Sequence, residues 1–151
     1  MIKVLFVCHG NICRSAAAEY IMKQIVKREG CEEAFVIASA GTSAEELGNG
    51  MYPPMYRELQ RAGVWVGDHR ARRLRREDYD KYDFLIGMDD ENRYNMNRMW
   101  PKDPEEKLHL LLDYTDHPRE VSDPWYTRDF AQAYRDIREG CEALFQEVWN
   151  Q

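Results

Sequence analysis

The apolar positions of the chain form two alternating patterns. Short apolar runs, which are typical of buried parallel strands, occupy 2–8, 34–38, 84–88 and 108–112. Helices are predicted over 15–28, 53–62, 90–99 and from 127 onwards, by apolar residues spaced three and four apart or by a Gly or Pro that ends the segment. Because strands and helices alternate, we expect one α/β domain over residues 1–151, with a four-stranded parallel sheet flanked by helices on both faces.

The composition is that of a globular protein. Of 151 residues, 44% are hydrophobic and 32% are charged, which is enough apolar material for one core. The net charge of −6 gives no general attraction for nucleic acid, so no such partner is expected. The arginine-rich segment 70–76 is a local exception. Because Glu77 and Asp78 follow it at once, we interpret the segment as a solvated helix face.

Membrane segments and metal sites are not predicted. No stretch approaches the roughly 20 apolar residues of a membrane helix, and the apolar opening is too short for a signal peptide. We therefore expect a cytoplasmic protein with no membrane partner, in which Cys8, Cys13, Cys31 and Cys141 are thiols. Their spacing matches no zinc pattern, and we expect neither metal nor cofactor. Cys141 falls on the apolar stripe of the last helix and is expected to be a core thiol.

The first strand runs directly into an unusual turn, in which five residues separate Cys8 from Arg14. In α/β sheets a strand, a turn with glycine and a helix start bind anions, because backbone N–H groups and the positive helix end converge there. These groups and the guanidinium of Arg14 favour a thiolate on Cys8 and can hold the oxygens of a tetrahedral dianion beside it. By position alone, Cys8 is more typical of an inert core residue. Together with Arg14 it predicts a phosphoryl-transfer site.

Displacement at phosphorus also needs an acid that protonates the departing oxygen, and Asp123 is the candidate. It stands before Pro124, Trp125 and Tyr126. The simpler interpretation is a helix-capping turn, because Asp and Pro are common at helix starts. That interpretation leaves two adjacent aromatic residues in a loop unexplained, whereas stacking on an aromatic substrate accounts for them.

These motifs resemble those of the low-molecular-weight protein tyrosine phosphatases. The segment 7–15 matches the phosphate-loop pattern V-C-x-G-N-I-C-R-S at every specified position, and Asp123-Pro124 with its aromatic pair matches the family's acid loop. Similar segments at 38–42, 47–49, 68–72 and 82–89 extend the resemblance over residues 1–149. The resemblance implies a flavodoxin-like or Rossmann-like three-layer sandwich that hydrolyses phosphotyrosine and small aryl phosphates.

The resemblance also implies three catalytic roles. Cys8 would form a phosphocysteine intermediate, Arg14 would bind the phosphate, and Asp123 would act first as acid and then as base. Cys13 would be a reversible disulfide partner that protects Cys8 from irreversible oxidation, although a small packing residue is the plain interpretation. The residues expected to bind the phosphate or line its loop are His9, Gly10, Asn11, Ile12, Cys13 and Ser15.

A supporting set is implied by the same resemblance. Ser15 would donate a hydrogen bond to the Cys8 sulfur and ease its departure in the second step. Asn11 would hold the loop in its strained shape, supported by Ser39 and His69. Taken alone, His69 is more typical of an ordinary surface or core histidine, and only the match around it favours the supporting role.

Three positions depart from the family pattern. His9 follows the nucleophile where the family often has a neutral residue, and Ala16 replaces a frequent proline. Glu45 stands where a Trp or Tyr usually lines the pocket wall. Trp125 and Tyr126 remain as the other wall.

Other functions stay open at this point. An arsenate reductase needs two further cysteines in relay, and Cys31 and Cys141 are poorly placed for that. A protein-arginine phosphatase of the same fold has Thr where this chain has Ile12. The third alternative is a catalytically silent module that binds anions or phosphopeptides. Such a module would be expected to lack part of the catalytic set, and no part is missing from this sequence. The phosphatase reading implies a phosphotyrosine-containing protein or peptide as partner and a monomer or weak homodimer.

Overall fold

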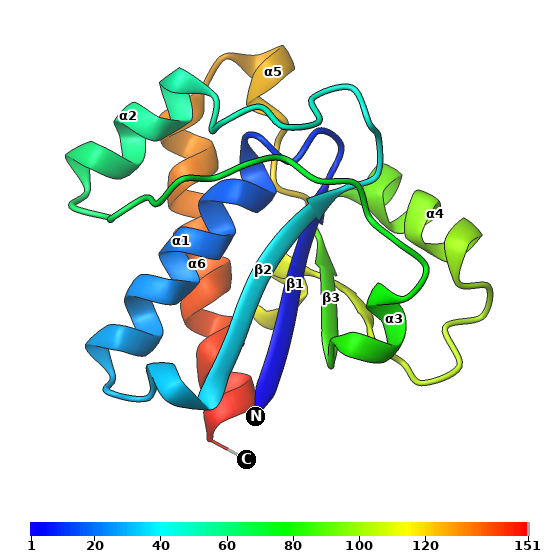
Figure 1. Ribbon diagram of the computed structural model, residues 1–151. Helices are drawn as coiled ribbons and strands as arrows, with labels where there is room; N and C mark the ends of the chain where they lie inside the picture. Colours follow the sequence, from blue (N-terminus) through cyan, green and yellow to red (C-terminus); the bar gives the residue numbers. More distant parts are fainter. Residues whose placement is uncertain (151) are drawn as a thin grey trace.

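The structure is a computed structural model that describes residues 1–150. Its centre is a parallel sheet whose strands lie in the order β2-β1-β3-β4 (Figure 1). The strands are β1 (Ile2–Cys8), β2 (Phe35–Gly41), β3 (Phe84–Gly87) and β4 (Leu108–Leu110). The register pairs Cys8 with Gly41 and Val7 with Gly87, so the carboxyl ends of the strands meet at one edge. Ligands of such sheets bind at that edge.

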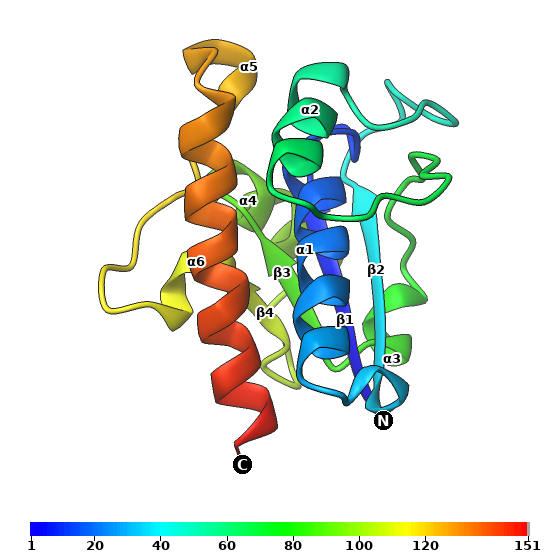
Figure 2. The same ribbon diagram turned by 90° about the vertical axis from the view of Figure 1, so that its left-hand side faces the viewer.

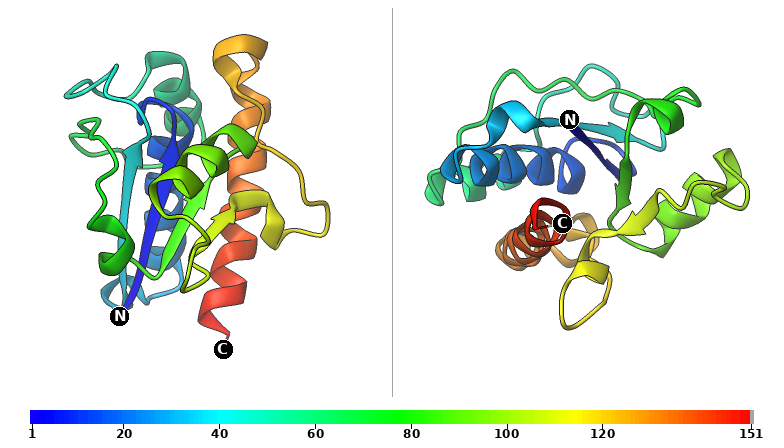
Figure 3. Two further views of the ribbon diagram at one scale, coloured as in Figure 1. Left: turned by 90° about the vertical axis from the view of Figure 1, so that its right-hand side faces the viewer. Right: turned by 90° about the horizontal axis from the view of Figure 1, so that it is seen from below.

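Helices cover both faces of the sheet. Figure 2 and Figure 3 show α1 and α6 side by side on one face, with α3 and α4 on the other. The α-helices are α1 (Arg14–Arg28), α2 (Pro53–Arg61), α3 (Asp78–Lys81), α4 (Asp90–Met99), α5 (Pro124–Thr127) and α6 (Phe130–Trp149), with 3₁₀ turns η1 (Glu32–Ala34) and η2 (Leu111–Tyr114). The predicted α/β sandwich is confirmed.

Strand β1 has apolar side chains on both of its faces, so helices are needed on both sides of the sheet to bury them. Its alternate residues point to opposite faces, and Val4 and Phe6 pack into the core beneath α1 and α6. Leu5 and Val7 join a second core beneath α3 and α4. All four are fully buried, as expected for a central parallel strand. Cys8 shares the face of Val4 and Phe6, which directs its sulfur towards the start of α1.

The predicted boundaries differ from the structure by two or more residues in three places. Strand β2 extends to Gly41 rather than 38, and β4 ends at Leu110 where a 3₁₀ turn begins. The short helix α5 precedes α6, which begins at Phe130 rather than 127. Local apolar patterns do not distinguish the end of a strand from a buried turn.

The prediction of a helix face for 70–76 is wrong. The segment is extended beside β2, where Gly41 donates to the Arg72 carbonyl (2.8 Å) and Leu74 donates to the Gly41 carbonyl (2.7 Å). These bonds cover the edge of β2, and most of the arginine side chains lie in solvent. The charge pattern indicated exposure correctly but carried no information on helix or strand.

Cys141 is a core thiol, as predicted. It is fully buried in α6, and its Sγ lies 3.7 Å from the Ala18 carbonyl of α1.

None of the helices within residues 1–150 has the length and apolar character that a membrane-spanning helix requires.

Candidate active site

The predicted phosphate-binding loop begins where β1 ends. Cys8 is the last residue of the strand and is only 4% exposed, and α1 begins six residues later at Arg14. Cys13, the residue before α1, makes no side-chain cap to the helix. The first N–H groups of α1 are therefore left for another acceptor, as in helix termini that bind anions. We call Cys8–Ser15 the floor of the site.

Asn11 holds the shape of the floor. It is fully buried with φ = 61°, a left-handed conformation that costs a non-glycine residue about 1 kcal/mol or more. Its carbonyl lies 2.6 Å from His69 Nε2, and its side-chain oxygen accepts from the Arg72 backbone N–H at 3.0 Å. Bonds from a distant segment therefore keep the strained turn in place. The expected partnership of His69 with Asn11 is present.

Ser15 links Asn11 to Cys8. The Asn11 Nδ2 group donates to Ser15 Oγ at 3.0 Å, and Ser15 Oγ lies 2.9 Å from Cys8 Sγ. Because the Asn11 amide donates a hydrogen bond to this hydroxyl oxygen, the serine O–H is free to donate to the sulfur. A hydrogen bond of this kind stabilises negative charge on Cys8.

Ser39 takes a different partner from the one predicted. Its hydroxyl donates to Glu19 Oε1 (2.6 Å) rather than to Asn11, and Lys23 Nζ lies 2.6 Å from the other oxygen of Glu19. A buried carboxylate needs such donors, so the serine satisfies Glu19. Ser39 supports the start of α1, and the direct support of Asn11 comes from His69 and Arg72.

Arg14 is anchored at the floor by two acidic residues. Its NH1 group donates to Asp89 Oδ2 (2.9 Å) and to the Val121 carbonyl (2.8 Å), and its NH2 group lies 3.4 Å from Asp123 Oδ2. Burial alone would lower the pKa of Arg14, but the negative groups around it, Cys8 foremost, raise the pKa above its ordinary value. The guanidinium is therefore a permanent positive charge beside the sulfur.

Asp123 fits both interpretations that the sequence allowed. It is the N-cap of α5, where its Oδ1 accepts from the Trp125 backbone N–H at 3.0 Å. Its other oxygen faces Arg14, and its side chain is 31% exposed. The cap orients the carboxyl group, and the second oxygen remains on the pocket side, where it can exchange a proton.

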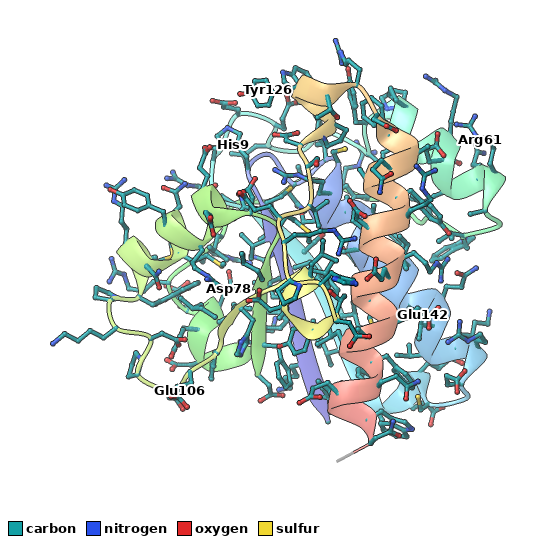
Figure 4. The ribbon with its side chains drawn as sticks, turned by 180° about the vertical axis from the view of Figure 1, so that it is seen from behind. His9, Arg61, Asp78, Glu106, Tyr126 and Glu142 are labelled. Carbon is teal, nitrogen blue, oxygen red and sulfur yellow. The ribbon has the colours of Figure 1, made fainter. Side chains whose placement is uncertain are left out.

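A pocket of about 310 Å³ opens above the floor. Its aromatic wall comes from Trp125, Tyr126 and Phe130, and Tyr52 packs against Trp125 with ring centroids 5.2 Å apart. Glu45 and Glu46, in the loop after β2, and His9 also line it. Figure 4 shows His9 and Tyr126 together at the upper end of the molecule. We call Glu45, Trp125 and Tyr126 the mouth of the pocket. The predicted wall residues all line this cavity.

The comparisons with known proteins agree with this geometry. The model of the low molecular weight phosphotyrosine protein phosphatase family matches residues 3–151. This chain belongs to that family. It is 35% identical over 150 residues to the low molecular weight protein-tyrosine-phosphatase YfkJ of Bacillus subtilis, covering 98% of this chain and 96% of the relative. A rat low molecular weight phosphotyrosine protein phosphatase is 35% identical over 153 residues, covering 96% and 94%.

Solved structures give the same result. The crystal structure of YfkJ from Bacillus subtilis superposes with a TM-score of 0.95 over 99% of this chain and 96% of that chain, at 35% identity. A Drosophila arginine phosphatase superposes with a TM-score of 0.86 over 97% and 98% of the chains, at 28% identity. The chain is a protein-tyrosine phosphatase, as the motifs predicted.

The cysteines of the phosphatase are all free thiols. Cys13 is half-buried on the floor, and burial, followed by the neighbouring Cys8, raises the pKa of its thiol above the ordinary value. Cys31 lies beyond the far end of α1, roughly 20 Å along a 15-residue helix from the floor. Cys141 is sealed in the core. Neither Cys31 nor Cys141 is placed to relay a disulfide from Cys8.

Sequence reasoning did not predict the anchoring of Arg14 by Asp89. Asp89 caps α4 by accepting from the Asn92 backbone N–H (2.8 Å) and also binds the guanidinium. One signal was available: Asp89 lies two residues after β3, whose carboxyl end lies beside that of β1. The hydrogen bond from Arg14 to the Val121 carbonyl could not be predicted from the sequence, because any residue can supply a backbone acceptor.

Proposed function

We propose that the phosphatase hydrolyses phosphotyrosine through a phosphocysteine formed on Cys8. One observation carries the proposal: Cys8 Sγ, the Arg14 guanidinium and the Asp123 carboxyl group border a single pocket. A nucleophile, an anion-binding fork and a proton donor are the parts that displacement at phosphorus requires.

In the first step, the Cys8 thiolate attacks phosphorus and the bond from phosphorus to the tyrosine oxygen breaks. Asp123 gives its proton to that oxygen, so the product leaves as a neutral tyrosine side chain. Arg14 and the free N–H groups at the start of α1 hold the phosphoryl oxygens throughout. The bonds that anchor Arg14 orient its fork before substrate arrives.

In the second step, the Asp123 carboxylate takes a proton from water, and the oxygen of that water attacks phosphorus. The bond from sulfur to phosphorus breaks, inorganic phosphate leaves, and Cys8 departs as a thiolate. The Ser15 hydroxyl, 2.9 Å from the sulfur, stabilises that thiolate. The cycle consumes one water and returns every residue to its starting state.

The mouth supports selection of tyrosine over serine and threonine esters. Cys8 lies at the bottom of the pocket, and Trp125 and Tyr126 stand at its rim with 52% and 83% of their surface exposed. A phosphorylated aryl side chain is long enough to span this depth and stack on the aromatic wall. A short serine ester would bring its peptide against that wall.

The protein-arginine phosphatase reading remains the second candidate. The likeness to the Drosophila arginine phosphatase supports it, and Ile12 on the pocket lining disfavours it, because the bulk of its side chain would crowd the guanidinium of a phosphoarginine.

We further propose a single-domain enzyme, monomeric or weakly dimeric, that acts in the cytoplasm on phosphotyrosine proteins. A reducing compartment suits a thiolate nucleophile. Cys13 is proposed as the partner of Cys8 in a reversible disulfide.

The proposal is tested with matched phosphotyrosine, phosphoserine and phosphoarginine peptides, using Cys8→Ser as the background. We expect release of phosphate from the phosphotyrosine peptide at a rate at least about 100-fold above Cys8→Ser, because the variant lacks the nucleophile. Faster release from the phosphoarginine peptide would replace the proposal with the second candidate. Comparable turnover by Cys8→Ser would reject Cys8 as the nucleophile.

A further inference from the structure

Glu45 stands on one side of the catalytic loop and the aromatic wall on the other. Figure 2 shows the loop that follows β2 and the helix α5 on either side of the loop that follows β1. Both groups line the same pocket. A phosphotyrosine that reaches Cys8 at the floor leaves its peptide backbone at the mouth, so the neighbouring residues of the peptide pass between Glu45 and the aromatic wall.

Backbone bonds tie the segment that carries Glu45 to the catalytic loop. Thr42 N–H donates to the Cys8 carbonyl (2.9 Å), and Ser43 N–H donates to the His9 carbonyl (3.0 Å). The loops also pack closely, because a side chain at Gly10 would come within 3.3 Å of Glu46. These contacts fix the backbone just before Glu45 relative to the floor, which a residue that contacts the substrate specifically requires.

His9 orients the carboxylate of Glu45. Its Nε2 lies 3.1 Å from Glu45 Oε2, with 47% of the His9 side chain and 71% of the Glu45 side chain exposed. Among residues 1–150, the other oxygen of Glu45 makes no hydrogen bond or ion pair, so it is open to a donor that enters the mouth. Two of the three departures from the family pattern, His9 and Glu45, thus form one contact.

The charges of the pocket decide which donor fits. Arg14 is already engaged by Asp89 and Asp123, so the guanidinium offers little attraction to a second acidic group at the mouth. On the side of the β2 loop the pocket is lined by two carboxylates, Glu45 and Glu46, and Glu46 already accepts a hydrogen bond from Asn49 Nδ2 (2.6 Å), which leaves Glu45 as the more available negative charge. A lysine or arginine beside the phosphotyrosine gains an ion pair there, and an acidic residue is repelled.

We propose that Glu45, oriented by His9, is a specificity-determining residue that favours phosphotyrosine peptides with a basic residue next to the phosphotyrosine. The inference rests on the proposed function and names the peptide class that this site selects. A single exposed ion pair is weak, but both attraction and repulsion enter the comparison of basic with acidic peptides. The corresponding preference in kcat/KM is about threefold to tenfold.

The test uses phosphotyrosine peptides that differ only in having Arg, Gln or Glu beside the phosphotyrosine, on either side in turn. For the wild-type enzyme, kcat/KM should be about threefold to tenfold higher with Arg than with Glu, and the ratio should shrink as salt is raised. Glu45→Gln should bring the ratio to about one, because it keeps the shape and removes the charge.

Two further variants distinguish a direct ion pair between Glu45 and the peptide from a general effect of negative charge around the pocket. Glu91→Gln removes the same charge from the α4 side of the pocket, and Glu33→Gln removes it from the exposed turn before β2, at the other end of the strands. Both should keep most of the preference. Equal loss in Glu45→Gln and Glu91→Gln, or equal use of the Arg and Glu peptides by the wild type, would overturn the inference while leaving the proposed function intact. Failure to hydrolyse any of the peptides would overturn both.

Discussion

On the pocket floor, Asn11, Arg14 and Ser15 are at most 3% exposed, whereas Trp125 and Tyr126 at the mouth are 52% and 83% exposed. The floor residues also bind one another and segments far along the chain, such as the Asn11 carbonyl and His69. The mouth residues have few such partners. The difference separates two tasks: the floor holds the reacting groups in one geometry, and the mouth selects what reaches them.

The largest expected effect is at Arg14. Arg14→Lys keeps the positive charge and loses the planar fork, which we expect to lower kcat by about 10²- to 10⁴-fold, because the fork holds the phosphoryl oxygens in the transition state. Steady-state kinetics with an aryl phosphate measure this loss. Arg93→Lys, at an exposed pair with Asp113, is the matched control and should change kcat less than about twofold. Equal, small effects in both variants would show that the floor does not depend on the fork.

The next effect is at Asn11, which holds the floor rather than the phosphate. Asn11→Ala loses both side-chain hydrogen bonds and keeps a strained φ of 61°. We expect activity to fall about 10- to 100-fold and the free energy of unfolding to fall by about 2–4 kcal/mol. Kinetics and urea unfolding measure the two losses.

Asn11→Gly is the informative companion, because glycine adopts positive φ without strain. It should recover part of the stability and little of the activity, since the bonds to Ser15 and Arg72 stay broken. Full recovery of activity would mean that backbone conformation alone maintains the floor.

The smallest effect is at the mouth. Trp125→Ala removes one aromatic wall and should lower kcat/KM for a phosphotyrosine peptide about two- to tenfold, mostly through KM, while the hydrolytic machinery stays in place. The matched control is Trp149→Ala, at the far end of α6, where the ring stacks on Phe145. If Trp125→Ala lowers kcat as strongly as Arg14→Lys, the separation of floor and mouth is wrong.

How well the sequence predicts each region follows the same division. The floor is one contiguous segment, Cys8–Ser15, so its chemistry can be recognised from a sequence motif. The strand before it and the helix after it are predicted by the spacing of apolar residues. The sandwich was predictable for the same reason. The arginine-rich segment 70–76 was not, because charge does not distinguish an exposed helix face from an extended segment along a sheet edge.

Contacts between distant segments also escaped prediction. Asp89 lies 75 positions from Arg14, and Glu45 lies 36 positions from His9. Ser39 was expected at Asn11 and instead satisfies the buried Glu19. Such pairs depend on how the layers pack, which a local pattern of apolar and polar residues does not specify.

In the proposed mechanism, Cys8 takes the phosphoryl group and Asp123 moves the protons. Asp123→Ala separates the two steps when the leaving group is an activated phenol. The first step then needs no proton and stays fast, whereas the second step lacks the base that activates water. Peptide substrates, whose tyrosine needs a proton, should be slowed in the first step.

The decisive measurement is therefore rapid mixing of Asp123→Ala with an activated aryl phosphate, followed by acid quench and mass spectrometry. The account predicts a burst of phenol close to one equivalent per enzyme, slow turnover afterwards, and a phosphoryl group on the peptide that contains Cys8. Linear phenol release with no phosphoryl group on Cys8, or equal slowing of activated and unactivated esters by Asp123→Ala, would contradict it.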